Sequence, residues 1–259
     1  MSSEATMAFD DAGSGIPVVF LHGLTFKRGT WQPIIDRLGP SVRSIAVDLP
    51  AHGDSAGPPQ PMDQVVARLH ELLESLGAER PIVVGHSMSG GLACLYAASF
   101  PTLGIAVIDN GPDIRPFARL VQQLEPRLRG PDFTEAWQMF ESSLGVDRIP
   151  EPSRSLVLAN HEVNQDVVVG YWEELLSDDP NNVQARVDSA LAKITVPLLG
   201  IFGRPISDAE RERFERLPEL HLEEWNGDGH FVHLVQPDRC AAALQTFITR
   251  CASADQVSK

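Results

Sequence analysis

The stretch that most constrains the fold of this chain is an apolar run that leads straight into a motif of small residues. Residues 81–84 read Pro-Ile-Val-Val, residues 85–89 read Gly-His-Ser-Met-Ser, and residues 88–98 are rich in Gly and Ala. A buried strand that turns into a helix within so few residues makes a sharp elbow. The residue at its tip is held in strained backbone geometry with its side chain pushed outward, and we expect Ser87 there.

Small neighbours of Ser87 fit this geometry. Gly85 and Ser89 would let the incoming strand and the outgoing helix approach closely without a steric clash. The usual elbow pattern is G-x-S-x-G, from which Ser89 departs at the last position. The pattern predicts a nucleophilic serine, and a Gly- and Ser-rich turn without chemistry is the alternative.

Length and charge narrow the classes of protein further. With 259 residues and 43% hydrophobic content, the chain is long enough for one large α/β domain with an insertion. A formal net charge of −14 would repel phosphate backbones and anionic lipids, so nucleic acid and membranes are poor partners. No apolar run reaches the roughly twenty residues that span a bilayer, and residues 1–6 have neither a basic start nor an apolar core. We therefore expect a cytoplasmic protein.

Apolar runs alternate with helical spacing along much of the chain. Further buried strands are predicted at 16–21, 42–49, 104–108, 196–202 and 220–225, helices at 30–38, 63–76, 207–217 and 237–250, and a turn at 10–15. Strands that are apolar throughout and alternate with helices indicate a parallel sheet covered on both faces. The alternation stops between residues 113 and 193, where the segments are helical and punctuated by prolines. We expect a core formed by 1–112 and 194–259, with 113–193 as a helical lid.

Four motifs in order make the chain resemble the α/β-hydrolase superfamily from about residue 9 to residue 248. They are His22-Gly23, which resembles the oxyanion loop; residues 48–55, similar to a D-x-x-G-x-G-x-S loop with Ala51 in place of Gly; the elbow at 85–89; and residues 229–237 around His230. This resemblance implies an α/β-hydrolase fold, with a mostly parallel central sheet flanked by helices. The helical lid would be inserted after the strand that follows the elbow helix.

A serine needs a base to become a nucleophile at neutral pH, and histidine suits that task. His230 follows Asn-Gly-Asp-Gly at 226–229, a flexible loop after a strand that could carry an imidazole to the carboxyl edge of the sheet. His233 is its main rival, and the family pattern favours His230. The residue after the nucleophile, Met88, would supply one oxyanion-binding backbone N–H. By resemblance, the second backbone N–H is that of Leu24.

Two aspartates compete for the role of the acid that orients His230. Most members of the superfamily carry this acid after the next-to-last strand as G-x-x-D, but here Ile206 occupies that place. Asp208 comes two residues later, where Ser207 to Glu210 reads as a helix capping box. Some members, haloalkane dehalogenases among them, place the acid at the end of the strand that follows the elbow helix. In this chain that residue is Asp109. We favour Asp109 over Asp208 and leave the choice open at this point.

The sequence therefore predicts a serine hydrolase that forms an acyl-enzyme on Ser87, with His230 as base and Asp109 as acid. We expect a small-molecule carboxylic ester with an apolar group, because hydrophobic residues surround the motifs and lid aromatics such as Phe117 and Trp172 are present. The same residues could act on a C–C bond, a lactone or an amide, and a noncatalytic small-ligand receptor is the alternative from another class. No cofactor or metal site is suggested, since Cys94, Cys240 and Cys251 have unrelated spacings. Whether the chain forms a homo-oligomer is left open.

Overall fold

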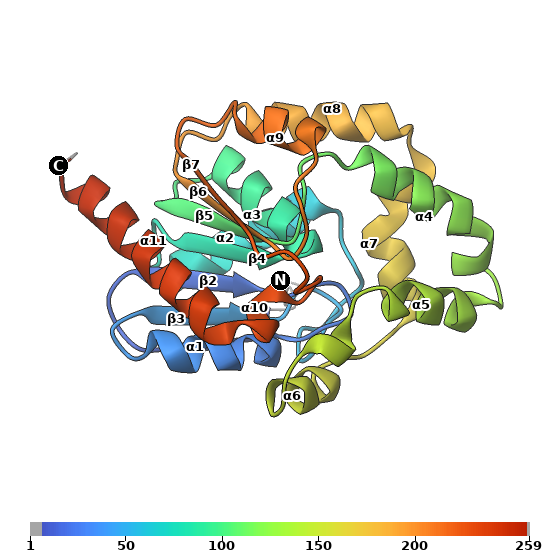
Figure 1. Ribbon diagram of the computed structural model, residues 1–259, viewed down its shortest axis with the longest axis horizontal. Coiled ribbons are helices and arrows are strands. Elements are labelled where there is room, and N and C mark those ends of the chain that lie inside the picture. The colour runs from blue at the N-terminus through green and yellow to red at the C-terminus, as the bar shows by residue number, and fades with distance from the viewer. Residues whose placement is uncertain (1–6, 258–259) are drawn as a thin grey trace, which may run out of the picture.

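A single twisted sheet forms the centre of the computed structural model, which describes residues 7–257 (Figure 1). Within those residues the sheet has seven strands in the order β1-β3-β2-β4-β5-β6-β7. The strands are β1 (Phe9–Ala12), β2 (Pro17–Leu21), β3 (Arg43–Val47), β4 (Ile82–His86), β5 (Gly104–Ile108), β6 (Leu198–Phe202) and β7 (Leu220–Glu224). Only the β1–β3 pair is antiparallel among these strands. The predicted parallel sheet is confirmed.

The first strand corrects a sequence-based expectation. A turn was predicted over residues 10–15, but Asp10 pairs with Ala46 and Asp11 with Ile45 in an antiparallel ladder. β1 lies at the edge of the sheet and three of its four residues are exposed, so the strand carries no apolar alternation. Its pairing with β3 depends on backbone hydrogen bonds that a hydrophobic pattern does not reveal.

Helices cover both faces of the sheet, and the strands supply alternate side chains to each. Val19 and Leu21 of β2 belong to the core on the side of α2 (Met62–Ser75) and α3 (Met88–Ser99). Val18 and Phe20 belong to the core on the side of α1 (Gln32–Leu38) and α11 (Pro237–Val257). This alternation follows from the two-residue period of a strand, which forces both faces to be apolar when both are covered. α11 runs beyond the predicted end at residue 250.

The remaining elements lie mostly between β5 and β6. Residues 113–193 contain α4 (Arg115–Leu128), α5 (Phe133–Ser142), η2 (Val146–Arg148), α6 (Ser153–Ala159), α7 (Gln165–Ser177) and α8 (Pro180–Leu191). Outside this segment are η1 (Arg28–Trp31), α9 (Asp208–Phe214) and α10 (Val232–Val235). In Figure 1, α4 to α7 lie to one side of the sheet, whereas α8 packs against α3.

The carboxyl ends of the parallel strands gather the predicted motifs at one edge of the sheet. His22 follows β2, Asp48 follows β3, Ser87 follows β4 and Asp109 follows β5. In parallel sheets this is the edge where ligands bind.

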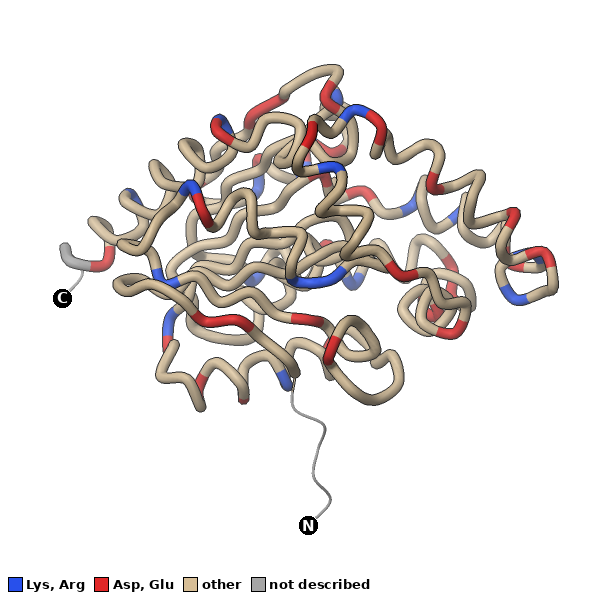
Figure 2. The backbone as a smooth tube through the Cα atoms, turned by 90° about the horizontal axis from the view of Figure 1, so that it is seen from below, with Lys and Arg blue, Asp and Glu red and all other residues tan. Residues whose placement is uncertain are grey.

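Charged residues are distributed along the whole fold rather than gathered in one place, as Figure 2 shows for the positions of Asp, Glu, Lys and Arg. None of the helices described in residues 7–257 is long and apolar enough to cross a membrane. Residues 1–6, on which the expectation about a targeting segment partly rested, lie outside the described residues.

Candidate active site

Ser87 occupies the tip of a sharp turn between β4 and α3. Its φ of 55° lies in the left-handed region, which is strained for a residue with a side chain. The Ser87 N–H donates to the carbonyl oxygen of Ile108 on the neighbouring strand, at 2.9 Å. A Cβ atom at Gly85 would stand 1.9 Å from the carbonyl oxygen of Ser89, so the strand and helix approach closely only because residue 85 is glycine.

Ser89, the departure from the usual elbow pattern, has a partner of its own. Its side chain is fully buried, and its hydroxyl donates to the carbonyl oxygen of His22. Next in that loop, Gly23 lies so near the elbow that a Cβ there would be 3.3 Å from the Ser87 Cβ. The hydroxyl of Ser89 therefore ties the loop after β2 to the start of α3, next to Ser87.

His230 and Asp109 are in direct contact. Nδ1 of His230 lies 2.8 Å from Oδ2 of Asp109. A carboxylate can only accept at that distance, so Nδ1 carries the proton and Nε2 of the neutral ring is an acceptor. The Asp109 side chain is 9% exposed and the His230 side chain is 20% exposed, which leaves the imidazole open to a cavity.

The turn after β5 holds the Asp109 carboxylate in place. Asp109 has a φ of 48°, and its N–H donates to the carbonyl oxygen of Ile201 at 2.8 Å. Its second carboxylate oxygen accepts the backbone N–H of Gly203 at 3.2 Å. The other aspartate of interest, Asp208, is exposed in the first turn of α9. The loop after β6, which leads to Asp208, the predicted alternative for the acid, thus supports Asp109 through the Gly203 N–H.

A capping box begins α9, as the sequence predicted. The Ser207 hydroxyl accepts the Glu210 N–H, and the Glu210 carboxylate accepts the Ser207 N–H at 2.9 Å. Arg204 adds a two-pronged ion pair to the same carboxylate, at 2.6 and 2.9 Å. These contacts give Ser207 and Glu210 a structural role beside the site.

The two other histidines near His230 are buried and neutral. Nε2–H of His86 donates to the carbonyl oxygen of His230 at 2.9 Å, and burial lowers the pKa of His86 well below its usual range. Burial lowers the pKa of His233 to about 3. The His233 ring packs between Trp31 and His86, with centroids 4.9 and 4.4 Å away, and does not line the cavity that contains Ser87.

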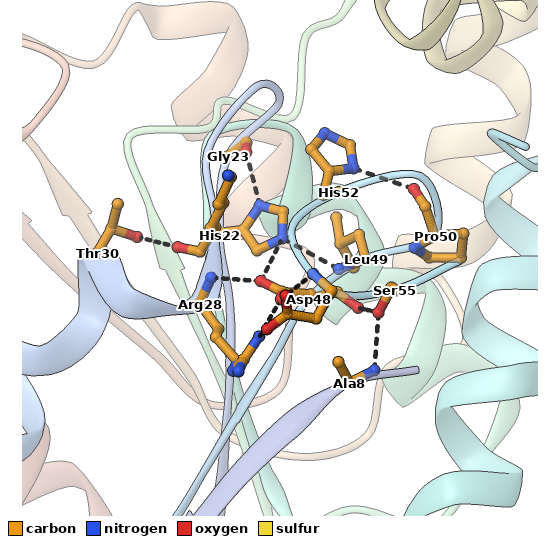
Figure 3. Close-up of polar contacts among 12 residues, drawn as sticks. Ala8, His22, Gly23, Arg28, Thr30, Asp48, Leu49, Pro50, His52 and Ser55 are labelled. Carbon is orange, nitrogen blue, oxygen red and sulfur yellow. Dashed lines mark hydrogen bonds and ion pairs between the residues drawn. The ribbon is translucent and has the colours of Figure 1, made fainter. Parts of the chain in front are cut away.

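Asp48 organises the loop after β3, as Figure 3 shows. Its buried carboxylate accepts the backbone N–H groups of Arg28 at 2.7 Å and Asp54 at 3.0 Å, and the Arg28 guanidinium pairs with it. Ala51, in the place where the superfamily pattern has Gly, adopts a left-handed φ of 63°. The motif around Asp48 is therefore a scaffold for the loops rather than a lining of the cavity.

His22 links the same scaffold to the loop after β2 (Figure 3). Its Nδ1–H donates to the carbonyl oxygen of Gly23 at 2.8 Å, and its Nε2 accepts the Leu49 N–H at 3.0 Å. Burial lowers the pKa of His22 well below its usual range, so the ring keeps one donor and one acceptor.

One cavity of about 1290 Å³ contains the three side chains Ser87, His230 and Asp109. Leu24 and Met88, the residues predicted to supply oxyanion donors, also line it. The phenylalanine, tyrosine and tryptophan residues in its wall are Phe26, Phe117, Trp137, Phe140, Tyr171, Trp172 and Phe214. The aromatics of α4, α5 and α7 also pack on one another, with ring centroids 5.3 to 5.6 Å apart for several pairs. They serve both as helix contacts and as cavity lining.

The cationic side chains in the cavity wall are already paired. Arg204 is bound to Glu210, and Arg186 pairs with Glu174 and with Asp178, the latter at 2.7 Å. Among residues 7–257, no group of three or more His, Cys, Asp or Glu side chains is arranged to hold a metal ion.

The sequence predicts residues that line this cavity but not the contacts that hold their loops. The positive φ of Thr25 (69°) and its hydrogen bonds to His52 and His161 have no sequence signature. His161 lies 136 residues from Thr25 along the chain, so only the folded structure brings the two together.

Comparison with known proteins assigns the chain to a family. A sequence model of the alpha/beta hydrolase family matches residues 18–243. The chain belongs to the alpha/beta hydrolase family, and its mostly parallel, helix-flanked sheet has the fold that the sequence predicted.

Individual relatives are more distant. The chain is 27% identical to 2-(acetamidomethylene)succinate hydrolase of Mesorhizobium japonicum, over 94% of this chain and 91% of that protein. It is 25% identical to the chloroplastic protein PHYLLO of Arabidopsis thaliana over 91% of its own length, but it spans only 15% of that longer protein. A thermophilic esterase from Thermogutta terrifontis superposes with a TM-score of 0.73 at 20% identity, covering 95% of this chain and 93% of that one. That likeness concerns the fold alone.

Proposed function

We propose that the protein is a serine hydrolase that cleaves a carboxylic ester through an acyl-enzyme on Ser87. The observation that carries the proposal is the contact between His230 and Asp109 on the cavity that also contains Ser87. A half-buried serine that lines a cavity, an imidazole open to the same cavity and a carboxylate behind that imidazole are the parts that nucleophilic acyl transfer requires.

The hydrogen bond from Nδ1–H of His230 to Asp109 leaves Nε2 as the base. Nε2 takes the proton of the Ser87 hydroxyl as Oγ attacks the ester carbonyl carbon, and the carbonyl electron pair moves to oxygen. When the tetrahedral intermediate collapses, the protonated His230 gives its proton to the leaving alcohol. Water then attacks the acyl carbon as it loses a proton to His230. The bond between that carbon and Oγ breaks, the carboxylic acid leaves, and His230 returns the proton to Oγ of Ser87.

Two backbone N–H groups are proposed to stabilise the oxyanion. Met88 is the first residue of α3, and the first N–H groups of a helix have no partner within that helix. The Leu24 N–H donates to no protein acceptor among residues 7–257, and the preceding Gly23 is close to Ser87. Each such donor contributes on the order of 3 kcal/mol of transition-state stabilisation.

An apolar acyl or alcohol group is the proposed specificity. The aromatic wall of the cavity favours apolar substrates, and Arg186 and Arg204 are neutralised by their carboxylate partners. Residues 113–193 contribute Phe117, Trp137 and Phe140 to that wall, which supports their proposed role as a lid.

A p-nitrophenyl ester panel of increasing acyl length tests the function. We expect turnover by the wild type and loss of at least about 10³-fold in kcat for Ser87→Ala. Ser99→Ala, at the exposed end of α3, is the matched control and should keep the wild-type rate. Equal rates in wild type and Ser87→Ala, or labelling by a serine-directed organophosphonate at another residue, would contradict the proposal. A wild type that binds esters without turning them over would favour the receptor alternative.

A further inference from the structure

Thr25 is a strained residue whose polar atoms are all engaged. It is 1% exposed and has a φ of 69°, a left-handed conformation that is strained for a residue with a side chain. Its carbonyl oxygen accepts the Glu162 N–H at 2.8 Å, and its hydroxyl donates to the carbonyl oxygen of Leu24 at 2.6 Å. Such a conformation persists only where surrounding contacts hold it.

The first of these contacts comes from the loop after β3. His52 Nδ1–H donates to the carbonyl oxygen of Pro50 at 3.0 Å, and this leaves Nε2 to accept the Thr25 N–H at 3.2 Å. Figure 3 shows His52 directed at Pro50. The Tyr171 hydroxyl of α7 donates to the same carbonyl oxygen at 2.9 Å, and its ring meets His52 edge-on at 5.2 Å. Burial lowers the pKa of His52, so Nε2 stays available as an acceptor.

The second contact comes from residues 113–193. His161, between α6 and α7, shares its Nε2–H between two acceptors, the Thr25 hydroxyl oxygen at 3.1 Å and the Glu141 carboxylate at 3.0 Å. The His161 ring stacks on Phe26 with centroids 4.7 Å apart and planes at 25°. Phe26 and His161 also form an isolated antiparallel bridge. The helical segment is thus bound to the loop that carries Leu24.

We propose that His52 and His161 are positioning residues that clamp Thr25 and thereby aim the Leu24 N–H at the oxyanion. The inference rests on the proposed function, in which Leu24 supplies that donor. The Leu24 N–H belongs to the peptide group before Leu24, whose Gly23 carbonyl oxygen accepts the Phe26 N–H at 3.1 Å. The peptide group after Leu24 is held through the Leu24 carbonyl by the Thr25 hydroxyl, which His161 in turn orients, so Leu24 is fixed from both sides. A backbone N–H that is displaced from its position stabilises the transition-state oxyanion less, because the donor is effective only when it is preorganised. The proposed lid therefore takes part in catalysis through His161.

Substitution of His161 tests the clamp. We expect His161→Leu to lower kcat for a p-nitrophenyl ester about 10- to 100-fold while KM changes less than about 3-fold, because the donor acts mainly in the transition state. His161→Gln, which keeps an amide donor near the position of Nε2, should recover most of the rate. His70→Leu is the matched control. The His70 ring also stacks on a phenylalanine, with its centroid 3.8 Å from that of Phe100, and it hydrogen bonds to the Tyr96 hydroxyl. Unlike Leu24, His70 lies outside the cavity.

A second variant separates the clamp from a general loss of stability. Thr25→Val keeps the shape of the side chain and removes the hydroxyl, and the folded variant should lose kcat about 10-fold or more. In a double-mutant cycle the losses of His161→Leu and Thr25→Val should not add, since both remove the same contact. Thermal unfolding of each variant shows whether it is folded.

The outcomes distinguish the clamp from the proposed function. Additive losses of kcat in the double-mutant cycle would overturn the clamp. So would a wild-type kcat in folded Thr25→Val or folded His161→Leu. If Ser87→Ala is inactive in these cases, the proposed serine hydrolase stands. A fall in kcat of the same size in His70→Leu would also overturn it. Retention of the full rate by Ser87→Ala would overturn the proposed function and the clamp together.

Discussion

The imidazole of His230 donates from Nδ1 to one oxygen of Asp109, 2.8 Å away, while the other oxygen of that carboxylate accepts the Gly203 N–H at 3.2 Å. Each oxygen of the Asp109 carboxylate therefore accepts a hydrogen bond, and the neutral His230 ring carries its proton on Nδ1. This arrangement matches the role of the acid in a nucleophile, base and acid triad.

Replacing Asp109 by Asn should lower kcat for an ester by about 10³- to 10⁴-fold, because an amide in that position favours the wrong imidazole tautomer. Steady-state kinetics on a p-nitrophenyl ester measure the effect. Asp208→Asn is the control, and its kcat should stay close to that of the wild type, since Asp208 lies in the exposed first turn of α9. A near-wild-type rate in Asp109→Asn would remove Asp109 from the proposed mechanism.

Acid should destabilise the fold below about pH 6.5, the usual pKa of histidine. Burial lowers the pKa of five histidines in the folded state: His22, His52, His86, His161 and His233. The unfolded chain binds protons at these rings as the pH falls through 6.5, whereas the folded state does not until the pH reaches the lowered values. The free energy of unfolding therefore decreases as the pH falls through this window.

His233 allows this pH dependence to be measured for one ring, because its folded-state pKa is about 3. Urea unfolding of His233→Leu between pH 6 and pH 4.5 should show a slope about 1 kcal/mol per pH unit smaller than that of the wild type. Val232→Ala is the control, since it removes a buried side chain next in sequence to His233 that cannot titrate, and its slope should equal the wild-type slope. Equal slopes in His233→Leu and wild type would mean that His233 is not kept neutral by the fold.

Ala51 should tolerate replacement by glycine better than an ordinary alanine does. Its φ of 63° costs a residue with a Cβ about 1–2 kcal/mol, which offsets the entropy that glycine loses on folding. Ala209 has a helical position in α9, so Ala209→Gly relieves no strain and only adds the entropy that glycine loses on folding, about 1 kcal/mol. Urea unfolding should give Ala51→Gly a free energy of unfolding at least about 1 kcal/mol above that of Ala209→Gly. An equal loss in both variants would contradict this account.

Local sequence predicted the elements that depend on near neighbours. The apolar residues of β4 and the small residues around Ser87 specify a strand, a turn and a helix within about twenty positions, so the elbow was predictable. The capping box of α9 was predictable for the same reason, since Ser207 and Glu210 are three residues apart. β1 was not, because its exposed residues owe their conformation to pairing with β3.

By itself the sequence determined the fold class, the position of Ser87 on its elbow and a choice between two aspartates beside His230. It favoured Asp109 without excluding Asp208, because Asp109 and His230 are 121 residues apart and meet only where β5 and the loop after β7 reach the same edge of the sheet. The clamp on Thr25 has the same origin, since His52 and His161 approach it from two different loops. Contacts of this kind depend on which strands are neighbours and how the helical segment lies over them, and local patterns of hydrophobicity carry no record of either.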